Sequence, residues 1–89
     1  GRRPVVVVSA DLYLAVLDTL AIVLPVTSTH RGWPNHVPLR GEHGLPQECW
    51  AMTEQPRTIA RARIAEVAGI VDRQTLDDLD VWMRDFLSL

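Results

Sequence analysis

Residues 20 to 26 read Leu-Ala-Ile-Val-Leu-Pro-Val and run directly into the polar stretch Thr27 to Gly32 (Thr-Ser-Thr-His-Arg-Gly). An apolar, β-branched run of this length predicts a buried strand. Upstream, Val5 to Val8 form a second β-branched run that shows no alternation, which predicts a strand buried on both faces. Between the two, capping side chains precede Leu12 to Leu17, which could form a helical turn or a loop. The chain therefore starts as a β protein.

Shorter segments follow these two strands. The two prolines in Trp33–Leu39 suit an edge strand, and the two glycines and one proline in Arg40–Gln47 predict a loop. We also expect strands at Cys49–Met52, Thr58–Ile59 and Ile64–Val71. The β-branched content of Ile64–Val71 favours strand over helix.

The clearest helix follows Asp72, a plausible N-cap. Apolar residues recur there at spacings of three and four, and acids fill the other face. The apolar positions are Leu76, Leu79, Trp82, Met83, Phe86 and Leu87. Trp82, Met83 and Phe86 suit the core better than a dimer contact. We predict a mainly β fold, an SH3-like barrel closed by a C-terminal α-helix, as one domain over residues 1–89.

Composition narrows the class of protein. The chain has 89 residues, 47% of them hydrophobic, and a single cysteine, so one core without an internal disulfide is expected. Small domains of this kind commonly oligomerise. Residues 1–63 hold seven Arg against five acids, whereas residues 65–89 hold two Arg against six acids. The absence of an apolar span or leader predicts a cytoplasmic protein whose front half tolerates an anionic partner.

The sequence contains no recognisable metal-binding or cofactor-binding motif. His30, His36, His43 and Cys49 lack the paired spacing of a zinc site. Cys49 lies in an apolar run and reads as a buried small hydrophobe. No nucleophile elbow or phosphate-binding glycine loop is present. We expect no metal and no cofactor.

Two polar groups remain, Arg2-Arg3-Pro4 before one strand and Thr27 to Arg31 after another. If the two strands are neighbours, a guanidinium and several hydroxyls share one rim, an arrangement that holds a phosphate without metal. From spacing alone, solvated arginines and ordinary turn residues are the favoured interpretation of these two groups.

Four segments in order resemble the MazF/PemK family of toxins. They are R-R-P-V-V-V-V-S at residues 2–9, I-V-L-P-V-T-S-T-H-R-G-W-P-N-H-V-P-L at residues 22–39, E-Q-P-R-T-I at residues 54–59, and a closing amphipathic helix that ends F-L-S-L. The resemblance covers essentially the whole chain. Two positions depart from the family pattern: Glu54 replaces an Asp, and Pro56 replaces an aliphatic residue and removes a backbone donor.

Carried over residue by residue, the resemblance makes Arg3 and Thr27 catalytic. It places the RNA-binding role on Ser28, Thr29, His30, Arg31, Gln55 and Arg57. Family members also have a strand and a glycine-rich loop before R-R-P. This chain either begins after such a segment or is a truncated homologue.

The resemblance implies a metal-independent endoribonuclease that cleaves single-stranded RNA through attack of the 2′-OH. Arg3 would stabilise the phosphorane and Thr27 would donate a hydrogen bond. His30 is either a proton shuttle or merely exposed, and Trp33 either stacks a base or packs on the barrel, with the Arg40–Gln47 loop as a second candidate for base contacts.

The implied partners are a MazE-like antitoxin, whose acidic tail covers the groove, and a second copy of the chain. Two alternatives stay open. One is a CcdB-like gyrase-binding toxin that acts through Trp82 to Leu89, and the other is a truncated homologue that only binds antitoxin.

Overall fold

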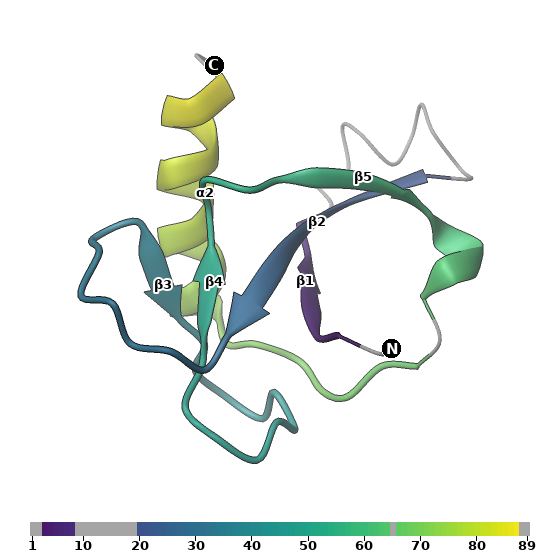
Figure 1. Cartoon of the computed structure of the whole chain (residues 1–89), viewed down its shortest axis with the longest axis horizontal. Coiled ribbons are helices and arrows are strands. Elements are labelled where there is room, and N and C mark those ends of the chain that lie inside the picture. The colour runs from purple at the N-terminus through teal and green to yellow at the C-terminus, as the bar shows by residue number, and fades with distance from the viewer. Residues whose placement is uncertain (1–2, 9–19, 65, 88–89) are drawn as a thin grey trace.

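The computed structural model describes residues 3–8, 20–64 and 66–87. It is mainly antiparallel β-sheet with one long helix near the C-terminal end (Figure 1). The elements are β1 (Val5–Val7), β2 (Leu20–Thr27), β3 (His36–Pro38), β4 (Trp50–Met52), β5 (Arg57–Ala60), the 3-10 turn η1 (Arg61–Arg63) and α2 (Arg73–Leu87). The expected fold class is confirmed.

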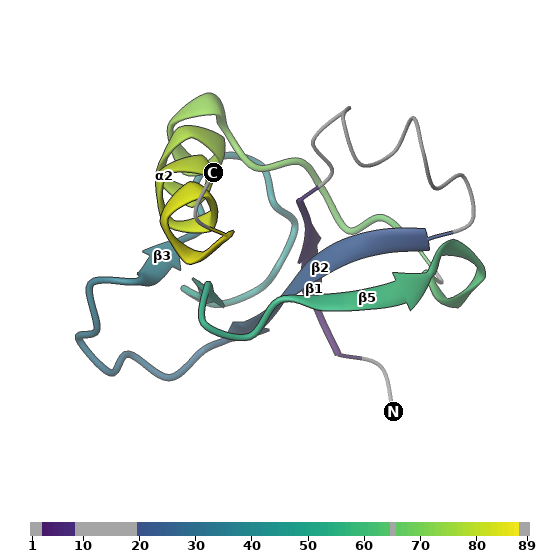
Figure 2. The same ribbon diagram turned by 90° about the horizontal axis from the view of Figure 1, so that it is seen from above.

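The sheet is built on β2, the longest strand. β1 pairs with one edge of β2, with Val5 opposite Pro25 and Val7 opposite Val23. The other edge pairs with β4 near the end of β2 and with β5 near its start. β3 pairs with β4 and completes the order β1-β2-β4-β3. From above, β2 and β5 run side by side and curve together (Figure 2).

A turn separates β4 from β5 along that shared edge. The backbone N–H of Gln55 donates to the carbonyl of Met52 at 3.2 Å, which closes the turn. β2 pairs with β4 from Val26 onward and with β5 only up to Val23, so the turn lies across from Pro25. Proline lacks an N–H and is tolerated in a strand where the ladder is interrupted.

The core lies between one face of the sheet and α2. Leu24 and Leu79 are fully buried there. The other buried members of the cluster are Val6, Val37, Leu39, Cys49 and Ala51. Val5 and Val7 are each 38% exposed. The expectation that β1 is buried on both faces was therefore wrong, because side chains alternate along a strand and only the Val6 face meets the core.

The N-terminus of α2 is held by a compact set of hydrogen bonds. Asp72 Oδ1 accepts from the backbone N–H of Thr75 at 2.9 Å and from its hydroxyl at 2.8 Å, which confirms Asp72 as the N-cap. The buried Thr75 hydroxyl also accepts from the backbone N–H of Arg40 at 3.0 Å. This geometry turns Thr75 and Leu79 inward. Leu76, one of the recurring apolar positions of the expected helix, is 41% exposed.

The strand predicted at Ile64–Val71 was wrong. In the described part of this segment the backbone is irregular after η1, and Val67 and Ile70 are 80% and 77% exposed. The backbone N–H of Ile70 donates to the carbonyl of Glu42 at 3.0 Å, so its hydrogen bond goes to the 40–47 loop and not to a sheet. The loop and this segment can approach closely because Gly44 has no Cβ. A Cβ at Gly44 would overlap the backbone of Ala68.

Other boundaries differ less. The predicted edge strand at Trp33–Leu39 is ordered as a strand only over His36–Pro38, and residues 40–47 form a loop as expected. Cys49 is buried, and burial raises the pKa of its thiol, in keeping with a small core residue. The helical turn or loop considered at Leu12 to Leu17 falls outside the described residues.

Candidate functional site

The register of β1 on β2 brings Arg3 beside Thr27. Val5 pairs with Pro25, and the backbone N–H of Val26 donates to the carbonyl of Pro4 at 3.2 Å. The next residues in this antiparallel register are Arg3 and Thr27, one at the start of β1 and the other at the end of β2. Residues directly opposite each other project from the same face of a sheet. The structure therefore brings together the two residues to which the sequence assigned catalysis.

Thr27 also defines a tight turn at the start of the 28–35 loop. Its Oγ1 accepts a hydrogen bond from the backbone N–H of Thr29 at 3.1 Å. A threonine hydroxyl has one hydrogen to donate in addition to its acceptor positions. The turn therefore fixes the oxygen and leaves its hydrogen to point toward a bound group. Ser28 and Thr29 are both exposed beside it.

Trp50 extends the site to a third strand. It lies directly opposite Thr27 in the β2–β4 pair and is half-buried. The exposed His30 ring stacks on the Trp50 ring, with centroids 4.8 Å apart and planes within 14°. Sequence reasoning missed Trp50, since only the register of β4 on β2 shows that it adjoins Thr27. We call the aligned residues Arg3, Thr27 and Trp50 the cross-strand row.

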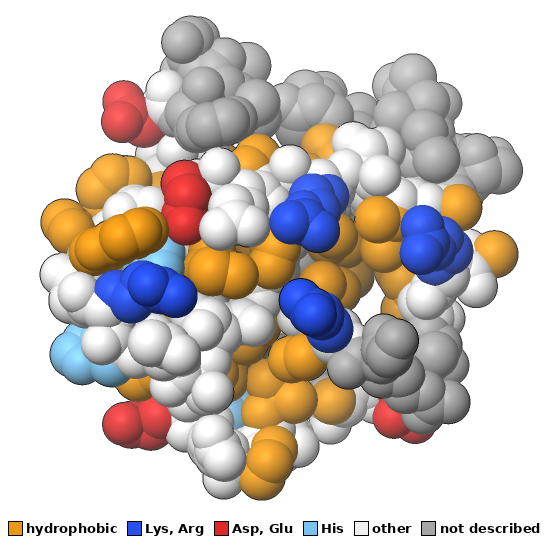
Figure 3. All heavy atoms as spheres, viewed as in Figure 1, with side chains coloured by type: hydrophobic (Ala, Val, Ile, Leu, Met, Phe, Trp, Pro, Cys, Tyr) orange, Lys and Arg blue, Asp and Glu red, His pale blue; other side chains and the backbone are white. Residues whose placement is uncertain are grey.

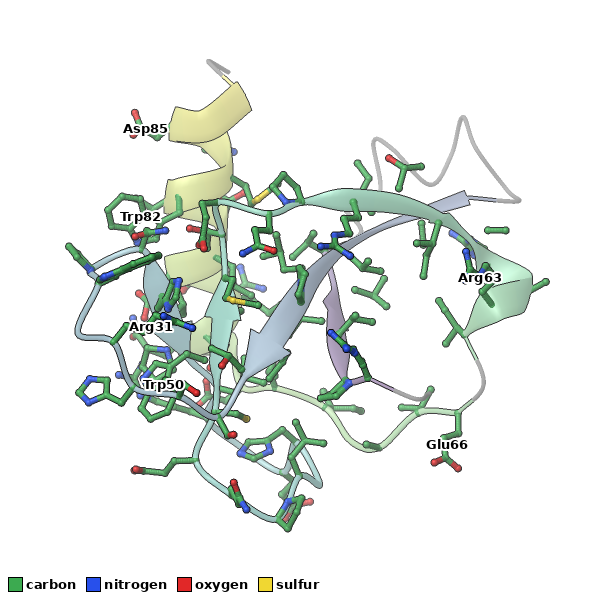
Figure 4. All side chains as sticks on the ribbon, viewed as in Figure 1. Arg31, Trp50, Arg63, Glu66, Trp82 and Asp85 are labelled. Carbon is green, nitrogen blue, oxygen red and sulfur yellow. The ribbon has the colours of Figure 1, made fainter. Side chains whose placement is uncertain are left out.

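Farther along the loop, Arg31 and Trp33 form a second contact. The Arg31 guanidinium carbon lies 5.6 Å from the centroid of the Trp33 ring, within the range of a cation–π interaction. Trp33 also meets the His36 ring, with centroids 4.7 Å apart and a tilt of 53°. Figure 4 shows Arg31 and Trp50 on the same side of the molecule, well away from Arg63 beyond β5.

His36 is buried and ties the loop to the turn between β4 and β5. Its Nε2 lies 3.1 Å from both carboxylate oxygens of Glu54. Asn35 Nδ2 donates to the same carboxylate at 3.0 Å, and the Thr53 hydroxyl donates to the Asn35 carbonyl at 2.7 Å. Glu54, a departure from the family pattern, is thus a fixed acceptor at the base of the 28–35 loop.

These contacts change the acidity of Glu54. Partial burial acts to raise the pKa of the carboxyl. Hydrogen bonds from its own backbone N–H, from His36 and from Gln55, together with the charge interaction with His36, outweigh that effect and hold the pKa below its ordinary value. The ionised carboxylate is the form that can accept from all these donors.

Gln55 and Arg57 lie at a different position along β2. Arg57 is opposite Val23, four residues before Thr27, and its guanidinium reaches the Gln55 side-chain oxygen at 3.5 Å. The parity of the register puts Arg57 on the same face of β2 as Thr27. The structure therefore brings these two residues together, on the site's face but apart from the 28–31 group.

Positive charge is distributed along this side of the molecule. Figure 3 shows basic side chains at several points over β1, β2 and β5, with hydrophobic side chains between them. The exposed arginines of the first 63 residues that the structure describes are Arg3, Arg31, Arg40, Arg57, Arg61 and Arg63. Among these, Arg40 pairs with Asp78 of α2 at 3.3 Å, and on α2 itself Arg73 and Arg84 pair with Asp77 and Asp80 at 3.1 and 2.9 Å. The anion-attracting character lies with the sheet and not with the helix.

Within the described ranges, no three His, Cys, Asp or Glu side chains gather as a metal site. No helix among those residues is long and apolar enough to cross a membrane.

The fold recurs in solved toxin structures. The Mycobacterium tuberculosis toxin MazF-mt6 is similar over 98% of this chain and 87% of its own, at 23% identity and a TM-score of 0.80. A MazE-MazF structure (Form-I) from Deinococcus radiodurans matches 100% of this chain and 85% of its own, at 28% identity and a TM-score of 0.80. A mycobacterial endoribonuclease in complex with its cognate antitoxin matches 100% and 84%, at 18% identity and a TM-score of 0.81.

These similarities define a class of small toxins with a curled antiparallel sheet and a closing helix. The chain belongs to the PemK-like, MazF-like toxins of type II toxin-antitoxin systems, whose family model matches residues 1–87.

Proposed function

We propose that this toxin is a sequence-specific endoribonuclease that cleaves single-stranded mRNA at a phosphate held by Arg3 and Thr27. The single observation that supports the proposal is the β1–β2 register, which sets a guanidinium beside a hydroxyl on one face at the strand ends. A mycobacterial structure with the same fold is described as an endoribonuclease. Family membership and local geometry therefore favour the same chemistry.

In the proposed reaction, the 2′ oxygen of the substrate forms a bond to the adjacent phosphorus. The bond from phosphorus to the 5′ oxygen of the next nucleotide breaks, the 2′ proton leaves and the 5′ oxygen gains a proton. The products are a 2′,3′-cyclic phosphate and a 5′-OH end. Charge grows on the phosphoryl oxygens along this path, and fixed donors directed at those oxygens lower the barrier.

Arg3 and Thr27 supply such donors. A guanidinium stays protonated in proteins and offers only donors, so Arg3 acts as a phosphate clamp and not as a base. Thr27 donates its free hydroxyl hydrogen to a non-bridging oxygen. His30, three residues farther on, carries an imidazole, the side chain that most often serves as a general acid or base, and we assign it the transfer of a proton. None of these roles needs a metal ion or a cofactor.

The remaining polar residues hold the RNA strand. We assign this role to Ser28, Thr29 and Arg31 on the loop and to Gln55 and Arg57 beside β5. Phosphate contacts of this kind position a strand and weaken as salt rises. The exposed arginines on the sheet side suit such a partner.

An antitoxin is the second proposed partner. The D. radiodurans structure is described as a MazE-MazF complex. We propose a MazE-like antitoxin whose acidic segment covers the arginines that otherwise hold RNA, with the toxin working in the cytoplasm as a homodimer.

The function is tested by incubating the purified protein with single-stranded RNA in EDTA. Discrete cuts that leave 5′-OH ends, and that are lost in Arg3→Ala and Thr27→Ala, are expected. Two other outcomes would replace the proposal. Toxicity that depends on Trp82 and neighbouring helix residues but not on Arg3 would indicate a gyrase-binding toxin. Antitoxin binding without any cutting would indicate an inactive homologue.

A further inference from the structure

His30 and Trp50 lie outside the core cluster of the described residues, and their stack adjoins Thr27, the residue proposed to hold the cleaved phosphate. Trp50 lies in β4, opposite both Thr27 of β2 and Pro38 of β3, so strand pairing on both sides fixes its backbone. Its ring is half-buried beneath the 28–35 loop. A rigidly held aromatic ring next to a reactive phosphate is the kind of surface on which a nucleobase stacks.

The His30 ring covers the Trp50 ring and remains exposed. Its ring is nearly parallel to that of Trp50, with centroids 4.8 Å apart. Among the residues that the structure describes, Trp50 is the one aromatic or cationic side chain in ring contact with His30. One face of the imidazole is therefore occupied by Trp50, and the exposed ring offers its other face to a flat ligand.

We infer that the His30–Trp50 stack is the base-binding platform of this toxin, on which one nucleobase adjacent to the cleaved phosphate stacks and which contributes to sequence choice. The inference rests on the proposed function for the identity of the ligand as RNA. The base would lie on the free face of the His30 ring, so that Trp50, His30 and the base form a stack of three rings. RNA-binding proteins commonly select unpaired bases by stacking them on aromatic rings or His.

The cross-strand row sets the position of that base. A phosphate held by Arg3 and Thr27 lies at the end of β2, and Trp50 is the next residue across the sheet on the same face. His30 is three residues beyond Thr27, on the loop that begins at its hydroxyl. The base carried by the nucleotide at this phosphate can therefore reach His30 without passing over the contact between Arg31 and Trp33.

Trp33 was the other candidate for this role and fits it less well. It is 48% exposed, but Arg31 lies over its ring at 5.6 Å and His36 meets it at 4.7 Å. Two side chains thus already contact the Trp33 ring. A base would have to displace Arg31, which loses a cation–π contact, whereas His30 needs no displacement.

The test measures binding of uncleavable probes, so it does not require that the cleavage sequence be known. The probes are fluorescein-labelled 2′-O-methyl homopolymers of A, C, G and U, and an abasic backbone of equal length. The full chain should bind at least one homopolymer more tightly than the abasic backbone. The variants are His30→Ala, His30→Phe, Trp50→Phe and Arg31→Ala, each checked for unaltered thermal unfolding.

Loss of a stacked base costs about 1–3 kcal/mol, which is about a 5- to 150-fold change in Kd. His30→Ala should remove an advantage of this size over the abasic probe, while His30→Phe and Trp50→Phe should keep it. Arg31→Ala should weaken the homopolymer and the abasic backbone by the same factor. An unchanged base advantage in His30→Ala would overturn the platform.

The same variants separate this inference from the nuclease proposal. If His30→Ala loses base-dependent binding but the unaltered chain cuts no RNA, the platform stands and the nuclease falls. If the chain cuts RNA and His30→Ala keeps both the base advantage and the cleavage pattern, the nuclease stands and the platform falls.

Discussion

Thr27 of β2 lies directly opposite Trp50 of β4, on the face of the sheet where the β1 register also brings Arg3. This pairing joins two kinds of recognition at one point, because a hydroxyl suited to a phosphate sits next to a ring suited to a base. Neither residue is adjacent to the other in sequence. Strand register sets the two side by side, so changes at this point should separate phosphate contact from base contact.

The hydroxyl of Thr27 can be tested apart from its shape. Thr27→Val keeps the β-branched form but has no hydrogen to donate, and we expect cleavage to slow by about 10²- to 10³-fold, the usual cost of one lost donor to a transition-state oxyanion. Thr27→Ser keeps the donor and should stay within about 10-fold of the unaltered rate. Single-turnover cleavage of a short RNA measures both. Equal rates for the two variants would show that the hydroxyl has no role.

Gly44 and Gly32 provide a matched pair for the contact between the 40–47 loop and the segment before α2. Their φ values are +74° and +73°, so alanine at either position is strained by about 1–2 kcal/mol. A Cβ at Gly44 would also overlap the carbonyl oxygen of Ala68, whereas one at Gly32 meets nothing within 4 Å. Gly44→Ala should therefore lose about 1–3 kcal/mol more than Gly32→Ala in urea unfolding. Equal losses would contradict the close contact.

The low pKa of Glu54 predicts how stability depends on acid. The pKa of the Glu54 carboxyl is lower in the folded state than in the unfolded state, so the unfolded state binds more protons in the pH window between the two values. The stabilisation by Glu54 is complete above this window and is lost as pH falls through the folded value. Asp72, whose pKa is lowered by donation from the Thr75 backbone and hydroxyl, acts in the same direction.

Urea unfolding at a series of pH values between about 3 and 6 measures this effect. The slope of stability against pH should be positive, and Glu54→Gln should make it shallower because one of the two carboxyls no longer titrates. Asp85→Asn, on the exposed end of α2, controls for the loss of one negative charge. A Glu54→Gln slope as steep as that of the unaltered chain would show that the His36–Glu54 contact does not stabilise the charged carboxylate.

Local composition predicted most of the elements. The apolar run from Leu20 and the spacing after Asp72 each correspond to an observed element, β2 and α2, because burial of one face dictates both patterns. The prediction of a strand at Ile64–Val71 was wrong for a reason that lies elsewhere in the chain. The backbone of Ile70 bonds to Glu42 in the loop, and no local pattern records that the loop passes there.

The site was predictable only in part for the same reason. Resemblance to a family singled out Arg3 and Thr27, and the register that unites them follows from the pairing of two recognisable strands. Trp50 gave no such signal, and Glu54 was recognised only as a departure from the family pattern. Their roles depend on how β4 aligns with β2 and on the turn that follows it, and a one-residue slip in that alignment would turn Trp50 to the other face.

The most direct test of the central claim is a double-mutant cycle on cleavage with Arg3→Ala and Thr27→Val, measured at a single turnover. Arg84→Ala, which removes an exposed arginine paired with Asp80 on α2, is the control. If the two residues hold one phosphate, each change slows cutting by about 10²-fold or more, and the double variant is far less impaired than the product of the two effects. Cutting at the unaltered rate in Arg3→Ala, while Arg84→Ala behaves normally, would contradict the account.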